Sequence, residues 1–159
     1  MKKYTQADFN AFEVIDGIKQ CPSGDYSDIQ IFGACCSFGK GCTFGACCSF
    51  GAWCSFGACC SFGECCFFGE CCFFGEGCSF EDKGEYIGDY PFMAFVGFGS
   101  RIGSKVYFFN LQDGIYVRCG CWLSDIAGFR ERVKAENADA MYLDLCDLVE
   151  RKFNQKNYK

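Results

Sequence analysis

The sequence contains no histidine and only two prolines, and it has no long uninterrupted apolar run. The lack of histidine excludes every mechanism built on imidazole, including Ser–His and Cys–His nucleophile pairs and histidine-ligated metals. A transmembrane helix needs about 18 or more consecutive apolar residues, so none is expected. The first residues, MKKYTQADFNAF, also lack the apolar stretch of a secretory signal. We therefore expect a cytoplasmic protein without membrane association.

Positive charge is in the minority, with 15 Lys and Arg against 20 Asp and Glu and a net charge of −5. This balance argues against general nucleic-acid binding. In contrast, 17 cysteines, 20 phenylalanines and 20 glycines are an abnormally large share of 159 residues. Because the number of cysteines is odd and an export signal is lacking, we expect reduced thiols that pack as small apolar groups.

Most of these residues belong to a six-residue repeat that runs from residue 32 to residue 79. It reads FGACCS, FGKGCT, FGACCS, FGAWCS, FGACCS, FGECCF, FGECCF and FGEGCS. Positions one, two and five are always Phe, Gly and Cys, and position six is Ser or Thr except at Phe67 and Phe73. An even period keeps the alternation of a strand in phase, so positions one and five share one side. Three strands then form a coil of three times six, or 18, residues, with Phe and Cys inside and with corners at positions three and four.

The repeat resembles that of the hexapeptide-repeat proteins, in which an aliphatic residue, a small residue, two variable residues and a small residue recur. That resemblance implies a left-handed parallel β-helix, although this chain has Phe at the aliphatic position and Cys at the inward small position. The best-known members are acyltransferases that use a histidine base, which this chain lacks. The Cys-Ser-Phe-Gly repeats, with residues 107–109 and 116–122, also resemble uncharacterised phage and bacterial proteins, and this resemblance implies no activity.

We predict a mainly β fold in three parts: an N-terminal cap (1–31), a short three-sided parallel β-solenoid (32–80) and a C-terminal α+β unit (81–159). Both ends of so short a solenoid need caps, because each coil buries its interior only against its neighbours. In the N-terminal cap, Thr5 followed by Asp8 predicts the start of a helix. Tyr26 is in register with position one, which predicts that the ladder of coils begins with a degenerate repeat.

The α+β unit is predicted as a small antiparallel sheet followed by two helices. Apolar segments 92–98 and 105–111, a turn at residues 112–114 and a third segment, 115–123, predict the strands. Ser124 is predicted to cap a helix over about 125–136, and a second helix is predicted over about 138–153.

Several residues that break the repeat pattern form a candidate interface. Phe67 and Phe73 occupy the outward position six, where two bare rings would form the kind of apolar patch that marks an interface. Three glutamates occupy position three of successive repeats, so successive corners each carry a carboxylate, and a tryptophan occupies another corner. The predicted interface comprises Phe67, Phe73, Glu64, Glu70, Glu76 and Trp53.

We expect a non-enzymatic interaction protein with no catalytic residues, no cofactor and no metal. The expected partner is a protein or a ribonucleoprotein complex, as for a phage or mobile-element inhibitor of a host CRISPR or restriction complex, and a homodimer is a further candidate. The alternatives are an acyltransferase-like hexapeptide enzyme and a structural or metal-binding cysteine-rich solenoid. Inward cysteines stack at 18-residue intervals, so thiolate metal sites and disulfides between neighbouring coils remain open. An enzyme requires a pocket with perturbed titratable groups, whereas a binding protein requires an exposed surface.

Overall fold

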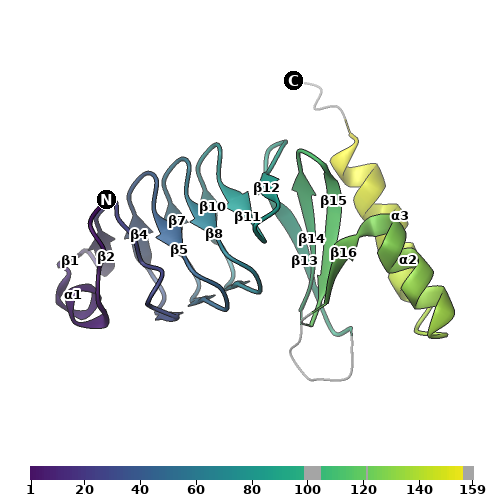
Figure 1. The fold of residues 1–159 in the computed structure, drawn as a ribbon, viewed down its shortest axis with the longest axis horizontal. Coiled ribbons are helices and arrows are strands. Elements are labelled where there is room, and N and C mark those ends of the chain that lie inside the picture. Colours follow the sequence, from purple (N-terminus) through teal and green to yellow (C-terminus); the bar gives the residue numbers. More distant parts are fainter. Residues whose placement is uncertain (99–104, 121, 156–159) are drawn as a thin grey trace. The chain divides into compact units, whose positions relative to one another are not determined.

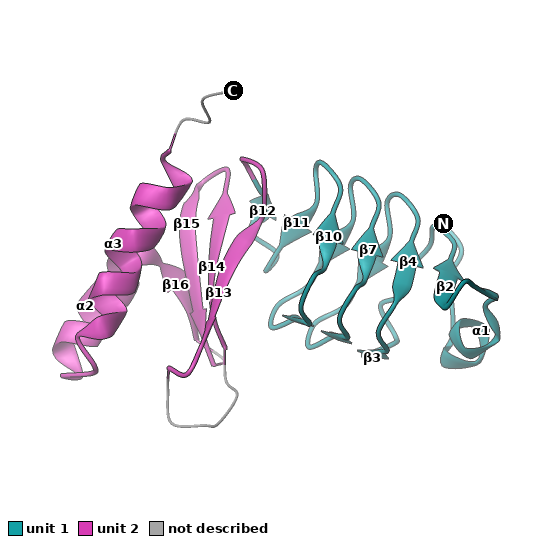
Figure 2. Ribbon diagram, turned by 180° about the vertical axis from the view of Figure 1, so that it is seen from behind, with its two compact units in different colours: residues 1–86 teal, residues 87–159 magenta. Residues whose placement is uncertain are grey.

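The computed structural model describes residues 1–98, 105–120 and 122–155, and it divides them into two compact units (Figure 2). Residues 1–86 form a parallel β-solenoid with its caps, and residues 87–159 form an antiparallel sheet with two helices. The mainly β fold class is therefore confirmed. The division falls after Tyr86, beyond the predicted end of the solenoid at residue 80.

Very short strands build the solenoid, stacked coil upon coil (Figure 1). Parallel pairing joins Ser37 to Ser55 and Phe38 to Phe56, so each coil takes 18 residues, as the repeat predicts. The three sides carry the strand orders β4-β7-β10, β3-β6-β9 and β5-β8-β11. The strands are β3 (Ile31–Phe32), β4 (Cys36–Phe38), β5 (Thr43–Phe44), β6 (Ser49–Phe50), β7 (Ser55–Phe56), β8 (Ser61–Phe62), β9 (Phe67–Phe68), β10 (Phe73–Phe74) and β11 (Ser79–Phe80).

The interior consists of three columns of stacked phenylalanine rings. Within a column the rings lie nearly parallel, as for Phe38 and Phe56 with centroids 5.2 Å apart and planes at 3°. Between columns they meet edge to face, as for Phe38 and Phe44 at 5.0 Å and 90°. Both geometries are favourable for aromatic quadrupoles. A flat ring also matches the spacing of about 4.8 Å between hydrogen-bonded strands, which explains how Phe can replace an aliphatic residue here.

Buried cysteines at position five fill the space beside the rings. Their thiols lie within hydrogen-bond distance of glycine carbonyls in the preceding coil: the Sγ of Cys54 is 3.4 Å from the carbonyl oxygen of Gly33, and the Sγ of Cys60 is 3.4 Å from that of Gly39. The same contact recurs at Cys66, Cys72 and Cys78. Cysteine therefore supplies a small apolar group and a weak hydrogen-bond donor at once.

The N-terminal cap closes one end of the ring columns. Helix α1 (Gln6–Ala11) starts with the predicted capping box, in which Thr5 Oγ1 accepts from the Asp8 amide and the Asp8 carboxylate accepts from the Thr5 amide. Strands β1 (Val14–Ile15) and β2 (Ile18–Cys21) form a hairpin, and β2 pairs in parallel with β4. Tyr26 stacks on Phe44 with centroids 5.6 Å apart, which confirms that the ladder begins before residue 32.

The other end of the solenoid has a cap of different chemistry. Strand β12 (Gly84–Glu85) folds back antiparallel on β11. The buried carboxylate of Glu81 accepts a hydrogen bond of 3.0 Å from the amide of Cys65, in place of a carbonyl from a further coil. The Tyr86 hydroxyl lies 3.2 and 3.1 Å from the carbonyl oxygens of Phe74 and Gly75. Side chains thus satisfy backbone groups of the last coil.

The second unit is a four-stranded antiparallel meander in the order β13-β14-β15-β16, followed by two helices. Its sheet contains β13 (Phe92–Val96), β14 (Lys105–Leu111), β15 (Gly114–Cys119) and β16 (Trp122–Asp125), and its helices are α2 (Ile126–Ala135) and α3 (Met141–Phe153). The prediction of a single strand over 115–123 is wrong, because the chain reverses at Gly120 (φ 64°). Residue 121, which lies in that predicted strand, is outside the described residues.

Both predicted helix starts also need correction. Strand β16 continues to Asp125, and the Asp125 carboxylate, not Ser124, caps α2 by accepting from the Gly128 amide at 2.7 Å. Helix α3 begins at Met141, where the Asp139 carboxylate accepts from the Met141 amide at 3.0 Å. The negative charge of an aspartate at a helix start also interacts favourably with the positive end of the helix dipole.

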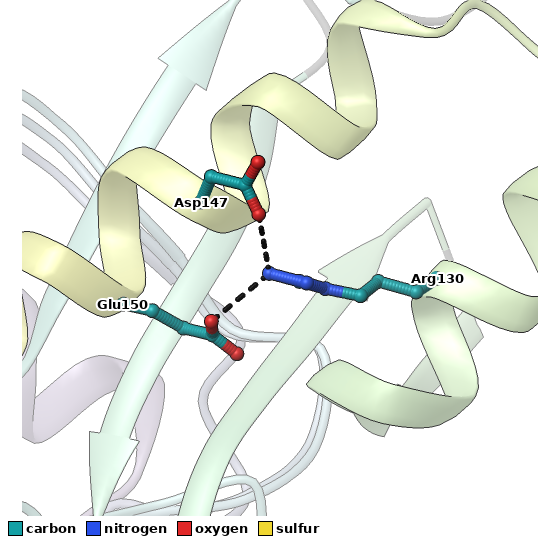
Figure 3. A network of polar contacts seen from close by, with 3 residues as sticks. All are labelled: Arg130, Asp147 and Glu150. Atoms are coloured by element: carbon teal, nitrogen blue, oxygen red, sulfur yellow. Dashed lines mark hydrogen bonds and ion pairs between the residues drawn. The ribbon is translucent and has the colours of Figure 1, made fainter.

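Packing between the helices and one sheet face forms the core of the second unit. The buried residues of this core are Val106, Phe108, Val117, Phe129, Val133, Tyr142, Leu145, Cys146 and Val149. Arg130 on α2 joins the helices by ion pairs of 2.9 Å to Asp147 and 3.0 Å to Glu150 on α3 (Figure 3). Among the described helices, none has the length and apolar character needed to cross a membrane.

Candidate interaction surface

The corners of the solenoid share an unusual backbone conformation. Position four has a left-handed φ, between 57° and 74°, in all eight repeats, although only Gly41 and Gly77 are glycines. Its amide donates to the position-three carbonyl of the next coil, as from Cys47 to Glu64 at 2.8 Å and from Trp53 to Glu70 at 2.9 Å. These bonds hold each corner residue directly over its equivalent 18 residues later, so the residue types on each edge can be read from the sequence.

One of the three edges is apolar along the solenoid. Its position-four column contains Cys35, Trp53 and Cys71. Ile18 of β2 extends this column, because Lys19 pairs with Cys36 and Ile18 precedes Lys19 as Cys35 precedes Cys36. Strand registers place Phe67 over Ser49 on one flank of this edge and Phe73 over Ser55 on the other. Exposed fractions are 60% for Trp53, 46% for Phe67 and 61% for Phe73. We call Ile18, Cys35, Trp53, Phe67, Cys71 and Phe73 the apolar edge.

The left-handed backbone conformation at Trp53 is energetically unfavourable for a bulky residue. A left-handed φ of 62° disfavours a bulky residue by about 1–2 kcal/mol, and the equivalent corners tolerate Gly and Cys. The conformation itself belongs to the repeat, because every position-four corner adopts it, but this corner carries a large side chain that is mostly exposed. Residues held in sparsely populated backbone conformations cluster at functional sites.

The predicted glutamates do not gather on one surface. Glu64, Glu70 and Glu76 are exposed, and their backbone carbonyls accept hydrogen bonds from three different corners, from the amides of Cys47, Trp53 and Cys59 respectively. A six-residue spacing therefore distributes the three carboxylates over the three edges of one coil. Only Glu70 lies beside the apolar edge, at the Trp53 corner, so the structure brings together Trp53, Phe67, Phe73 and Glu70 from the predicted interface.

Hydrogen bonds between stacked thiols shift the pKa values of the inward cysteines in both directions. They lower the pKa of Cys42, Cys48 and Cys78. Hydrogen bonding with Cys21, together with burial, raises the pKa of Cys36 to about 12, and hydrogen bonding with Cys36 raises the pKa of Cys54 to about 11. Hydrogen bonding with Cys42 and Cys78 raises the pKa of Cys60, because it stabilises the protonated Cys60 thiol. Metal ligation requires thiolates, so the raised pKa values disfavour it at Cys36, Cys54 and Cys60. Among the described residues, no three Cys, Asp or Glu side chains converge as a metal site would require.

The second unit contains a small cavity of about 170 Å³ beside β15 and the two helices. It is lined by Cys119, Trp122, Phe129, Arg132, Val133, Glu136, Ala138 and Tyr142. Arg132 lies over the Trp122 ring, 4.3 Å from its centroid, and pairs with Glu136 at 2.9 Å. Burial and the neighbouring Cys119 raise the pKa of Tyr142, which moves this hydroxyl away from the range useful for acid–base catalysis at neutral pH.

The sequence identified the aromatic residues of the apolar edge but not their common location. The missing signal was the assignment of repeats to edges, since residues 18 apart share an edge and residues six apart do not. Cys71 could have been found by the same count, whereas Ile18 could not, because β2 pairs with β4 at a separation of 17 residues, as Lys19 with Cys36. Comparisons with protein-family models, with curated proteins and with solved structures give no significant match to this chain.

Proposed function

We propose that this chain is a non-enzymatic interaction protein that binds a protein partner through the apolar edge. The observation that carries the proposal is Trp53, an exposed tryptophan held in a left-handed corner where Gly occupies two equivalent positions. Tryptophan is the side chain most enriched at the energetic centres of protein interfaces. Phe67 and Phe73 flank it on adjacent sides of the solenoid and extend the apolar surface.

The chemistry of the partner follows from the composition of this surface. The apolar edge offers aromatic rings and thiols, with the carboxylate of Glu70 at the Trp53 corner, and a net charge of −5 does not favour nucleic acid. A groove or patch of apolar side chains on a protein complements such a ridge. The alternative, an acyltransferase-like enzyme, is not favoured, because the chain lacks the histidine base that hexapeptide-repeat acyltransferases use.

A narrower hypothesis is that the partner is a host defence complex, as for a phage or mobile-element inhibitor. A small acidic protein of this kind would act by occupying its target. This hypothesis stays a prediction. The left-handed coil and the resemblance to hexapeptide-repeat and phage proteins also stay predictions. Recovery of CRISPR or restriction subunits with the protein would support it, whereas recovery of unrelated proteins would not.

The test is affinity capture of partners from the lysate of a host cell, with Trp53→Gly as the key variant. Glycine relieves the left-handed strain at this corner, so the variant should melt at or above the temperature of the parent protein. Loss of an interface hot spot costs about 2 kcal/mol or more, so capture should weaken by about 30-fold or more.

Cys59→Gly is the matched control. Cys59 has nearly the same φ, 60° against 62°, and lies on a different edge, between Gly41 and Gly77. This variant should keep full capture. Equal capture by the Trp53→Gly variant and the parent would exclude the apolar edge as the binding surface.

A further inference from the structure

The corner cysteines are distributed unequally over the three edges. Cys35, Trp53 and Cys71 occupy one position-four column, and Gly41, Cys59 and Gly77 occupy a second. The third column places Cys47 directly over Cys65. Among the eight corners, only this column has cysteines at position four of two consecutive coils.

The backbone holds this pair at the spacing of neighbouring hydrogen-bonded strands. Cys47 and Cys65 have the same φ, 59°, and the Cys47 amide donates to the carbonyl of Glu64, the residue before Cys65, at 2.8 Å. Strands bonded in this way lie about 4.8 Å apart, within the range of Cα separations found across disulfides.

The direction of the corner side chains is seen in the second column. A Cβ atom placed on Gly77 would lie 3.2 Å from the Sγ of Cys59, its neighbour one coil earlier. Each sulfur of a disulfide lies about 3 Å from the Cβ of its partner, as the bond lengths require. The Cys59 thiol thus points along its column to the next corner. The same side-chain conformation at Cys47, which has nearly the same φ, would direct its thiol to Cys65.

Solvent access separates this pair from the inward cysteines. Cys47 is exposed and Cys65 is half-buried, whereas Cys48 and Cys66 beside them are buried. The inward thiols also lie 3.3 Å from backbone carbonyls, as at Cys48 with Ile29 and Cys66 with Gly45. A dissolved oxidant therefore reaches the corner pair first.

We propose that Cys47 and Cys65 form a reversible intrachain disulfide when the protein meets a low-molecular-weight disulfide such as oxidised glutathione. The Cys47 thiolate attacks one glutathione sulfur, the sulfur–sulfur bond of glutathione breaks, and one glutathione thiolate leaves. The Cys65 thiolate then attacks the Cys47 sulfur of the mixed disulfide and releases the second glutathione. The protein loses two electrons and two protons, and these reduce oxidised glutathione to two glutathione thiols.

The bond would link consecutive coils on an edge other than the apolar edge. Oxidation would therefore tie two corners together and leave Trp53, Phe67 and Phe73 available to a partner. An exposed disulfide of this kind is readily reduced, so dithiothreitol should restore both thiols.

The experiment uses the whole protein, incubated with oxidised glutathione, alkylated without reduction and digested after glutamate. Cleavage after Glu64 separates Cys47 from Cys65, so a linked pair of peptides reports the bond, and fragmentation assigns its sulfurs. We expect one Cys47–Cys65 linkage as the main product. It should be absent in Cys47→Ser and Cys65→Ser and unchanged in the matched control Cys59→Ser.

Three results would overturn the proposal. They are stable glutathione adducts on Cys47 and Cys65 without a cross-link, a main linkage that involves other cysteines such as Cys66, or a cross-link that survives in Cys47→Ser. If either serine variant unfolds, the fragmentation spectrum of the parent protein still decides between the assignments.

Discussion

Glycine at position two of the repeat is required by the closeness of neighbouring coils. A Cβ atom on Gly63 would lie 2.7 Å from the amide nitrogen of Ala46 in the preceding coil, and one on Gly57 would lie 2.7 Å from that of Lys40. Such distances force the two backbones apart. Gly33 belongs to the first repeat, and a Cβ there meets no atom within 4 Å.

This difference predicts opposite outcomes for the same substitution. Gly63→Ala should lower the free energy of unfolding by about 1–3 kcal/mol, as overpacking does elsewhere. Gly33→Ala, the matched control, should be neutral or stabilise by up to about 1 kcal/mol, because alanine restricts the unfolded chain. Urea denaturation measures both, and equal destabilisation by the two variants would contradict close coil contact as the reason for the glycines.

The facing of individual residues in the repeat could be predicted from the sequence, whereas their hydrogen-bond roles could not. The even period correctly placed Phe50 and Cys54 inside and Ser49 outside. It carried no sign that the Cys54 thiol would approach a glycine carbonyl, because that contact depends on coil spacing. The left-handed corners were also hidden, since Cys and Trp are not the residues that signal a positive φ.

At the scale of elements, the solenoid depends on what ends it. Glu81 is buried, and its carboxylate accepts the Cys65 amide that would otherwise donate to a further coil. Glu81→Ala should lower the free energy of unfolding by about 1–3 kcal/mol, because it leaves the part-buried Cys65 amide without that acceptor.

Glu81→Gln is the control for the cap, because its side-chain carbonyl can still accept the bond. Thermal melting should rank the parent first, the glutamine variant close behind it and the alanine variant last. Amide hydrogen exchange at Cys65 should accelerate in Glu81→Ala alone. If the alanine variant melts with the parent, the carboxylate does not serve as the cap.

Ends and connections of elements were the hardest parts to predict. Glu81 opens the segment EDKGEY, which reads only as the end of the repeat, and its role depends on an amide 16 residues earlier. The reversal at Gly120 was missed because residues 115–123 are mostly apolar and a lone glycine within them is a weak turn signal. By contrast, the capping box at Thr5 was predictable, because both of its partners lie within one helical turn.

For the molecule as a whole, the distribution of charge distinguishes apolar docking from imitation of nucleic-acid charge. An acidic mimic needs carboxylates gathered on one surface, whereas Glu64, Glu70 and Glu76 belong to three different corners. Exposed charges that are more than about 10 Å apart are largely screened at 0.1 M salt. Attraction to a basic partner through these three residues would therefore be weak and sensitive to salt.

The triple variant Glu64→Gln, Glu70→Gln and Glu76→Gln tests this distinction. If the apolar edge provides the binding energy, the triple variant should retain partner capture within about threefold, and capture by the parent should persist at about 0.5 M salt, because burial of apolar surface is not weakened by screening. Trp53→Gly should lose capture under the same conditions. The reverse pattern, with capture lost in the triple variant and at high salt but kept in Trp53→Gly, would show that the carboxylates bind the partner and that the tryptophan does not.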